Sequence, residues 1–329
     1  MKPYKTVIYS FLVGGLFALI AQAILAFWQV TLADTPMAFF MGGATLVSMG
    51  VIGCILGGMA NYQHVEEWAT FGALLPFSGF AMAVGMKAVG PWTMKNETAA
   101  KCTWNVCWFV VWFNVVAAAI CIVFGFILGM AGVQPAFTIE KVEGPILFFN
   151  AFIVGGLLAA IFQIVFLLIK GVRPKTTPLF VLTTAWMCGA VFAPLGVSGA
   201  LANWAGEGFS VMITVGGYNM YNVGFDLAMG HIDAALLHLG SFLLAVFGLM
   251  ITALFTWIIY NFNFGRTPIH VVHVAQAQRA IDELTEQLPP ADNLEGLDYD
   301  IDPEYIEAVK KAHHSQTIVV EEVTTTTNA

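Results

Sequence analysis

Apolar residues are grouped in eight long stretches, which short polar or glycine-rich segments separate. The stretches cover residues 7–30, 36–60, 69–90, 103–133, 145–169, 178–203, 208–230 and 234–262. Most of them reach the roughly 20 residues that an α-helix needs to cross the hydrocarbon core of a bilayer. With 58% hydrophobic and 10% charged residues, the chain has more apolar surface than a water-soluble core can hide. The pattern therefore predicts an all-α polytopic membrane protein.

Two of the stretches are interrupted near their middles. Pro76-Phe77-Ser78-Gly79 breaks the stretch 69–90, and Val215-Gly216-Gly217 breaks the stretch 208–230. Broken backbone at membrane depth persists only where protein or a water-filled cavity covers it. We therefore expect both stretches to form re-entrant helical hairpins, each of which enters and leaves the membrane on the same side.

The chain contains an internal repeat. Phe11 to Gln22 returns 141 residues later as Phe152 to Gln163, with eight of twelve positions identical. At an offset of 136 residues, Trp68 to Gly79 falls on Trp204 to Val215. Such duplications are typical of channels and transporters, because two related halves can enclose a path between them. We assign residues 1–133 to a first membrane repeat, 134–147 to a linker and 148–263 to a second membrane repeat.

The positions of lysine and arginine predict the orientation of the two halves. If each half has three transmembrane helices plus a re-entrant hairpin, its span number is odd, and the second half is inverted relative to the first. With a cytoplasmic N-terminus, twelve of the thirteen basic residues then lie inside, and only Lys141 lies outside. A rival topology with eight complete spans would place Lys87, Lys95 and Lys101 outside. We therefore expect a tandem inverted repeat in the bacterial cytoplasmic membrane, with both termini cytoplasmic.

The tail, residues 264–329, carries the net charge of the chain. It has twelve acidic and four basic residues, whereas the preceding part has nine of each sign. Pro268 to Leu288 is expected to be an amphipathic or surface helix, and the remainder a linker and a disordered end. A solvated appendage is the simpler interpretation, and a docking segment for a soluble cytoplasmic partner is the alternative.

Two glutamines occupy matching places in the repeats. Gln22 and Gln163 lie inside otherwise apolar helices, where an amide needs polar partners within the bundle. Both side chains should therefore face inward. Two roles remain open: a hydrogen bond between helices that fixes the packing, or a place on the wall of a pore.

The predicted hairpin tips carry the candidate substrate path. Ser78 with Gly79, and Thr214 with Gly216 and Gly217, adjoin the two tips. A hydroxyl there can cap the second half-helix, and the exposed amides and positive dipole end would attract an anion. Asn219 adds a polar group beyond the second tip, and Glu207 is a candidate for handling a cation or a proton.

The remaining polar residues give weak signals. The five cysteines lie in or beside apolar stretches and are expected to act as small hydrophobes. His64, Glu66 and Glu67 are expected in a solvated vestibule before the first hairpin, and His231, Asp233 and His238 are a weak metal pattern. The sequence has no nucleotide-binding loop or catalytic triad motif. We therefore expect no enzyme activity, no cofactor, no metal and no nucleic-acid partner.

The order of these motifs resembles a known family. Each copy has a Phe-x-Val-Gly-Gly block with a following Gln and then a Trp-Ala-x-x-Gly stretch, and the first copy continues into Pro-Phe-Ser-Gly-Phe-Ala. This arrangement is similar to the membrane subunits of the stage V sporulation A (SpoVA) family, here as two units fused in tandem. The resemblance covers roughly residues 9–130 and 148–260. It implies passage of dipicolinic acid with calcium across the spore inner membrane, through a channel assembled from several subunits.

Two functions follow as hypotheses. The first is a channel or transport subunit for a small anion such as dipicolinate or its calcium chelate, in a homo-oligomer or hetero-oligomer with other membrane subunits. The second is a closed membrane scaffold whose acidic tail recruits a soluble partner. An integral-membrane enzyme has the least support from the sequence.

Overall fold

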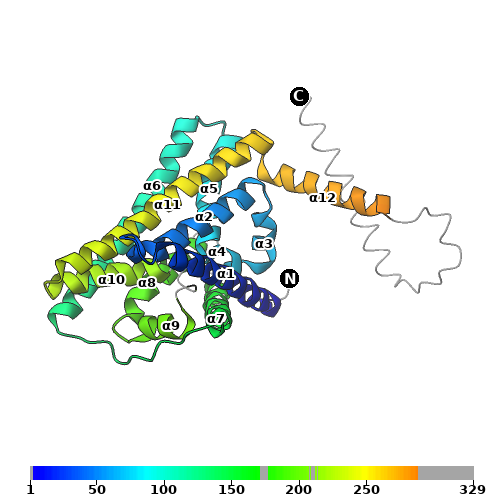
Figure 1. The fold of residues 1–329 in the computed structure, drawn as a ribbon. Helices are drawn as coiled ribbons and strands as arrows, with labels where there is room; N and C mark the ends of the chain where they lie inside the picture. Colours follow the sequence, from blue (N-terminus) through cyan, green and yellow to red (C-terminus); the bar gives the residue numbers. More distant parts are fainter. Residues whose placement is uncertain (1–2, 171–176, 207, 209–211, 213, 288–329) are drawn as a thin grey trace, which may run out of the picture. The chain divides into compact units, whose positions relative to one another are not determined.

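The computed structural model describes residues 3–170, 177–206, 208, 212 and 214–287. This part of the chain is helical, with no β-strand. Residues Met1–His273 form one compact unit that contains both repeats, and Val274–Ala329 form a second unit. The helices are α1 (Pro3–Leu32), η1 (Ala38–Phe40), α2 (Met41–Gly58), α3 (Tyr62–Ala69), α4 (Phe71–Leu74), α5 (Phe77–Met94), α6 (Ala99–Met130), α7 (Ile146–Ile169), α8 (Thr177–Phe192), α9 (Val197–Ala205), α10 (Thr214–Ala228), α11 (Ile232–Phe264) and α12 (Ile269–Gln287) (Figure 1).

Long apolar helices confirm the predicted class of membrane protein. In the described residues, five helices are long and apolar enough to cross a bilayer, and a bent pair raises the number to six. The five are Pro3–Leu32, Ala38–Gly58, Ala99–Met130, Ile146–Ile169 and Ile232–Phe264. Their outward faces are apolar, as the exposed Trp104, Trp108 and Trp112 on α6 illustrate. Such faces suit contact with lipid rather than water.

The stretch 178–203, which we expected to be one continuous span, is two helices. Pro178–Phe192 and Val197–Ala205 meet at an angle of 95°. The bend coincides with the segment Ala193-Pro194-Leu195-Gly196. Pro194 has no amide hydrogen to donate, and Gly196 has a φ of +76°, a conformation that glycine adopts without strain. The first half has the same order of elements, because α2 also ends before a turn and the short helix α3.

The first predicted hairpin stretch is broken at the expected tip. In the second, Val215-Gly216-Gly217, which we expected to interrupt the stretch, lies inside a helix. In the first half, α4 ends at Leu74 and α5 begins at Phe77. In the second half, α10 begins at Thr214. Pro76 and Met212, which correspond at the 136-residue offset, form an isolated antiparallel β-bridge with each other. The two break points are therefore in direct contact.

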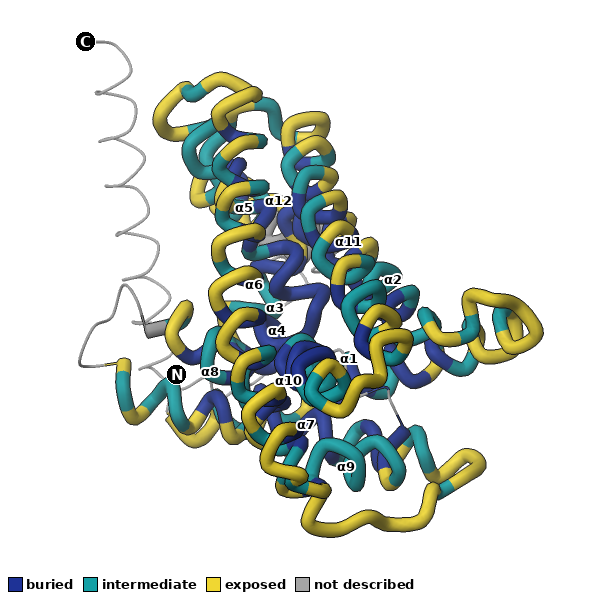
Figure 2. Tube along the Cα trace, turned by 90° about the vertical axis from the view of Figure 1, so that its left-hand side faces the viewer, coloured by how far each residue is buried: buried dark blue, intermediate teal, exposed yellow. Residues whose placement is uncertain are grey.

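The crossing of α1 with α7 is built from matching residues of the two halves. The Phe11 and Phe152 rings make an edge-to-face contact with centroids 5.7 Å apart and an interplanar angle of 86°. A Cβ on Gly15 would lie 2.7 Å from the Phe152 carbonyl oxygen, and one on Gly156 would lie 2.7 Å from that of Phe11. The absence of side chains at these glycines lets the backbones approach closely. Figure 2 shows buried residues on the inward faces of the helices and exposed residues on their outward faces.

Candidate functional site

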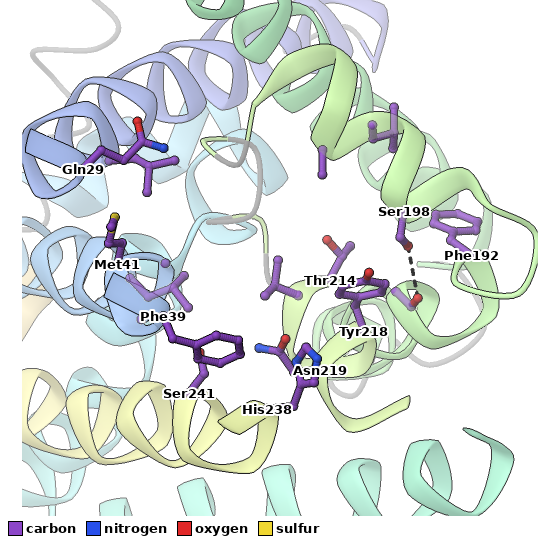
Figure 3. Close-up of a pocket in the computed structure, with 18 of the residues that line it drawn as sticks. Gln29, Phe39, Met41, Phe192, Ser198, Thr214, Tyr218, Asn219, His238 and Ser241 are labelled. Atoms are coloured by element: carbon purple, nitrogen blue, oxygen red, sulfur yellow. Dashed lines mark hydrogen bonds between the residues drawn. The ribbon is translucent and has the colours of Figure 1, made fainter. Parts of the chain in front are cut away.

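The main cavity lies between helices of both halves. It has a volume of about 460 Å³ and is lined by residues of α1, η1, α2 and α7 to α11 (Figure 3). This volume falls within the range of about 300–1,000 Å³ that is common for small-molecule sites. The polar lining residues are Gln29, Ser198, Thr214, Tyr218, Asn219, His238 and Ser241.

Two residues predicted for the substrate path, Thr214 and Asn219, line this cavity. Thr214 is the first residue of α10, and its side chain points toward the open space in Figure 3. Its hydroxyl donates a hydrogen bond to the Met212 carbonyl at 3.2 Å, and the side chain is only 5% exposed. Helix α10 therefore presents its N-terminal end, with a hydroxyl group, to the cavity.

The start of α10 is the feature of the cavity that could bind an anionic group. Its described lining residues include no aspartate, glutamate, lysine or arginine. The first amides of a helix have no partner within the helix, and the helix dipole places partial positive charge at this end. A negatively charged group in the cavity would accept hydrogen bonds from α10 without meeting a carboxylate from these residues.

The other predicted glycines of α10 have packing roles. A Cβ on Gly216 would lie 2.5 Å from the indole nitrogen of Trp186, and one on Gly217 would collide with the Trp186 carbonyl oxygen. Both glycines therefore allow α10 to lie against α8. Gly216 also borders a second, smaller cavity of about 40 Å³, which shares Asn219 with the main cavity.

Ser78, the counterpart of Thr214, lies in a closed environment. It is fully buried, and its hydroxyl is 2.9 Å from the hydroxyl of Tyr62. The Tyr62 hydroxyl also donates to the Ala73 carbonyl at 2.9 Å. Burial raises the pKa of Tyr62 far above its ordinary value, so this hydroxyl stays neutral. Gly79 lies against the Ala73 carbonyl, where a Cβ would not fit.

The two halves differ in the size of the side chains at the positions that line the cavity in the second half. In the first half, the ring of Tyr62 stacks on Phe17 at a centroid distance of 5.7 Å and an interplanar angle of 14°. The corresponding residues of the second half are Ser198 and Leu158, and both line the cavity. Two aromatic rings therefore occupy the space beside Ser78, whereas two smaller side chains leave space beside Thr214.

Gln22 and Gln163 form reciprocal hydrogen bonds between the halves. The amide of Gly208 donates to the Gln22 Oε1 atom at 2.8 Å, and the amide of Phe71 donates to the Gln163 Oε1 atom at 3.2 Å. The Gln163 Nε2 atom also donates to the Thr6 hydroxyl at 3.2 Å. The structure thus shows the hydrogen-bonding role for both glutamines, and neither borders the main cavity.

The sequence did not indicate every residue that lines the cavity, and one of the residues that it did indicate cannot be placed. Glu207 falls outside the described residues. Gln29, Ser198 and Ser241 line the cavity but were not singled out from the sequence. A position-by-position comparison of the repeats would have pointed to Ser198, because its counterpart is the large aromatic Tyr62.

Comparison with known proteins identifies the family. The sequence model described as "SpoVAC/SpoVAEB sporulation membrane protein" matches residues 6–131 and 147–259. The two matched regions coincide with the two repeats and leave the acidic tail unmatched. Searches of the curated proteins and of the solved structures found no match. The chain therefore belongs to the SpoVAC/SpoVAEB family of sporulation membrane proteins and contains two tandem units of that family.

Proposed function

We propose that this protein is a non-enzymatic channel or transport subunit for a small anion such as dipicolinate or its calcium chelate. The observation that carries the proposal is the cavity of about 460 Å³, whose lining includes Thr214, the first residue of α10. Family membership supports a role as a sporulation membrane subunit. The spore inner membrane is the membrane in which this role would be carried out.

The cavity has the groups that a small dicarboxylate needs. Carboxylate oxygens are strong acceptors, and the cavity offers the α10 amides together with side-chain donors from Thr214, Tyr218 and Asn219. Aromatic rings such as Phe39 and Phe192 supply apolar walls for a flat ring. The cavity would thus bind the charged ends of the anion at α10 and cover its ring with apolar surface.

The proposed path runs between two halves of opposite orientation. Support comes from the antiparallel bridge between the corresponding residues Pro76 and Met212, and from the reciprocal contacts of Gly15 and Gly156. Reciprocal contacts between matching residues are those that a two-fold rotation produces. With a cytoplasmic N-terminus, the cavity opens away from the cytoplasm, because the C-terminal part of α1, with Gln29, lines it.

In this proposal, Tyr62 and Phe17 close the cytoplasmic side of the path. Their stacked rings occupy the place that corresponds to the cavity, and Tyr62 is bonded to the hairpin residues Ala73 and Ser78. Opening would require the Tyr62 side chain to leave these two hydrogen bonds. The described conformation would then be open on one side and closed on the other.

Flux of dipicolinate from liposomes tests the proposal. The full chain, reconstituted alone and together with other sporulation membrane subunits, should release dipicolinate faster than protein-free vesicles. The double substitution Leu158→Phe and Ser198→Tyr gives the cavity the aromatic residues of the first half, so it should abolish this release. Tyr62→Ser should increase it, because it removes the aromatic ring that closes the other side.

Thr214→Val provides a finer test with a matched control. Loss of the hydroxyl should reduce release roughly 2-fold to 10-fold, the effect of one hydrogen bond worth about 0.5–1.5 kcal/mol. Thr183→Val is the control, because the Thr183 hydroxyl bonds to Leu179 within α8 and does not line the cavity. An absence of release in every reconstitution, with a soluble protein still bound to the tail, would instead support the scaffold alternative.

A further inference from the structure

We propose that His64, Glu67 and His273 form a binding site for a divalent transition-metal ion of the zinc class. One ligand atom from each of the three residues lies within 4.8 Å of the others. His64 and Glu67 belong to α3, and His273 belongs to the first turns of α12. The site is separate from the main cavity, whose lining includes none of these residues.

The distances within this cluster are close to those of a metal centre. Glu67 Oε1 is 3.8 Å from the His273 Nδ1 atom, and Glu67 Oε2 is 4.0 Å from the His64 Nδ1 atom. Zinc bonds of about 2.0–2.2 Å in tetrahedral geometry place ligand atoms about 3.3–3.5 Å apart. Glu67 is 64% exposed and His64 is 43% exposed, so small rotations of these side chains can close the difference.

The ligands of the cluster are positioned by α3 and by a buried neighbour of His273. His64 and Glu67 are three residues apart on one helix and therefore share a face. Val272, next to His273, is buried in an apolar cluster with Ala60, Val89 and Tyr260. His273 itself is only 20% exposed. Because Val272 is buried, it restricts the position of His273, the ligand that α12 contributes, near His64 and Glu67.

A second observation concerns the imidazole of His273. Its Nε2 atom is buried and has no hydrogen-bond partner in the described residues. The rings of His64 and His273 are tilted by 37° to each other at a centroid distance of 4.6 Å, so two protonated imidazoles would repel each other. A metal bound to the Nδ1 atoms of the neutral rings, which are the atoms nearest Glu67, would remove this repulsion. Coordination of His273 through Nε2 would instead give that buried atom a partner.

The ligand types select the class of metal. Two imidazoles and one carboxylate suit zinc and neighbouring transition metals, whereas calcium and magnesium prefer oxygen ligands. With three protein ligands, the fourth position would be left to water or another group. A bound ion would tie the beginning of α12 to α3, the helix that also carries Tyr62.

Titration of the purified, untagged full-length protein with Zn²⁺ in a calorimeter tests the inference. The protein should bind one Zn²⁺ per chain with an affinity that exceeds that for Ca²⁺ at least about 100-fold, because the ligands are mostly nitrogen. His64→Ala, Glu67→Gln and His273→Ala should each weaken this binding at least about 10-fold, as expected when one of three ligands is lost. His270→Ala is the matched control, because His270 is exposed on the same turn of α12 and is not in the cluster.

Melting without metal separates a lost ligand from a lost fold. His64→Ala alters a partly exposed side chain and should melt like the unsubstituted protein in the absence of metal, but its melting temperature should no longer rise with Zn²⁺. The inference is overturned if the three variants bind Zn²⁺ as the unsubstituted protein does, or if His270→Ala is the variant that weakens binding. Because the measurement needs no transport, its result is independent of the proposed channel function.

Discussion

Buried amides connect the two halves at the residue scale. Gln22 and Gln163 lie 4% and 1% exposed within apolar helices, and each accepts a backbone hydrogen bond from the opposite half. The segments that provide these backbone amides lead to the break points of the two predicted hairpins. In an apolar environment, an amide without an acceptor is costly. The glutamines therefore hold each hairpin approach in place from the other half.

Gln22→Leu and Gln163→Leu should each lower the free energy of unfolding by about 1–3 kcal/mol, since each leaves a buried backbone amide without its acceptor. Thermal or denaturant unfolding in detergent measures this loss. Gln29→Leu is the matched control, because Gln29 is an exposed residue of the same helix as Gln22. Equal stability of all three variants would contradict a structural role for the two hydrogen bonds.

The sequence predicted part of the candidate site. Thr214 and Asn219 were selected from their places near a break in an apolar stretch, and both line the main cavity. Gln29 could not be selected in this way, because it is one exposed polar residue near a helix end. The difference between Tyr62 and Ser198 depends on volumes in the folded protein, which the hydrophobic pattern does not report.

At the scale of elements, the crossing of α1 with α7 depends on small residues. Gly14 and Gly155 each lie against an alanine of the opposite helix, and Gly15 and Gly156 each face a phenylalanine carbonyl. Lipid tails give no hydrophobic driving force between helices, so close packing must supply the association. The matching motif of the two repeats is therefore the surface through which the repeats contact each other.

Gly156→Val should destabilise the protein by roughly 1–3 kcal/mol or more, because its Cβ alone would lie 2.7 Å from the Phe11 carbonyl oxygen. The melting temperature in detergent provides the measurement. Gly199→Val is the control, since no atom lies within 4 Å of a Cβ at Gly199. An unchanged melting temperature for Gly156→Val would show that the helices do not depend on this close approach.

The elements themselves were predicted with two clear errors. Apolar length predicted the long helices, and the interruption at Pro76 predicted the helix start at Phe77. The interruption expected at Val215-Gly216-Gly217 is instead part of α10, which begins at Thr214. The continuous span 178–203 was wrong, because the local conformation at Pro194 and Gly196 outweighs the apolar character of the stretch. Hydropathy reports whether a segment prefers lipid or water, and it does not report whether the segment bends or which way it crosses the membrane. The opposite orientation of the halves accordingly stays a prediction.

At the scale of the whole molecule, the family match and the helices describe a membrane protein made of two related units. Reciprocal contacts between matching residues place these units in one compact body. The basic residues then predict which ends face the cytoplasm. The topology decides whether the main cavity opens toward the cytoplasm or away from it.

A cysteine placed at Lys95 should react with a membrane-impermeant maleimide only after cells are opened, because this position is predicted to be cytoplasmic. Cysteines placed at Asp34 or Lys141 should react in intact cells. The measurement needs a background in which the five native cysteines have been replaced. Labelling of position 95 in intact cells would support eight complete spans and would remove the basis for a path between inverted hairpins.

The covalent linkage of the two units bears on how their pseudo-symmetry was lost. In a homodimer of single units, one gene encodes both copies, so a tyrosine at the position of Tyr62 would be present twice. In the fused chain, the second copy of that position is Ser198, and each site can change by itself. Gene fusion thus permits stacked aromatic rings in one half and a cavity at the matching place in the other half. In the proposed channel, the two ends of the path would therefore differ without a second, different subunit.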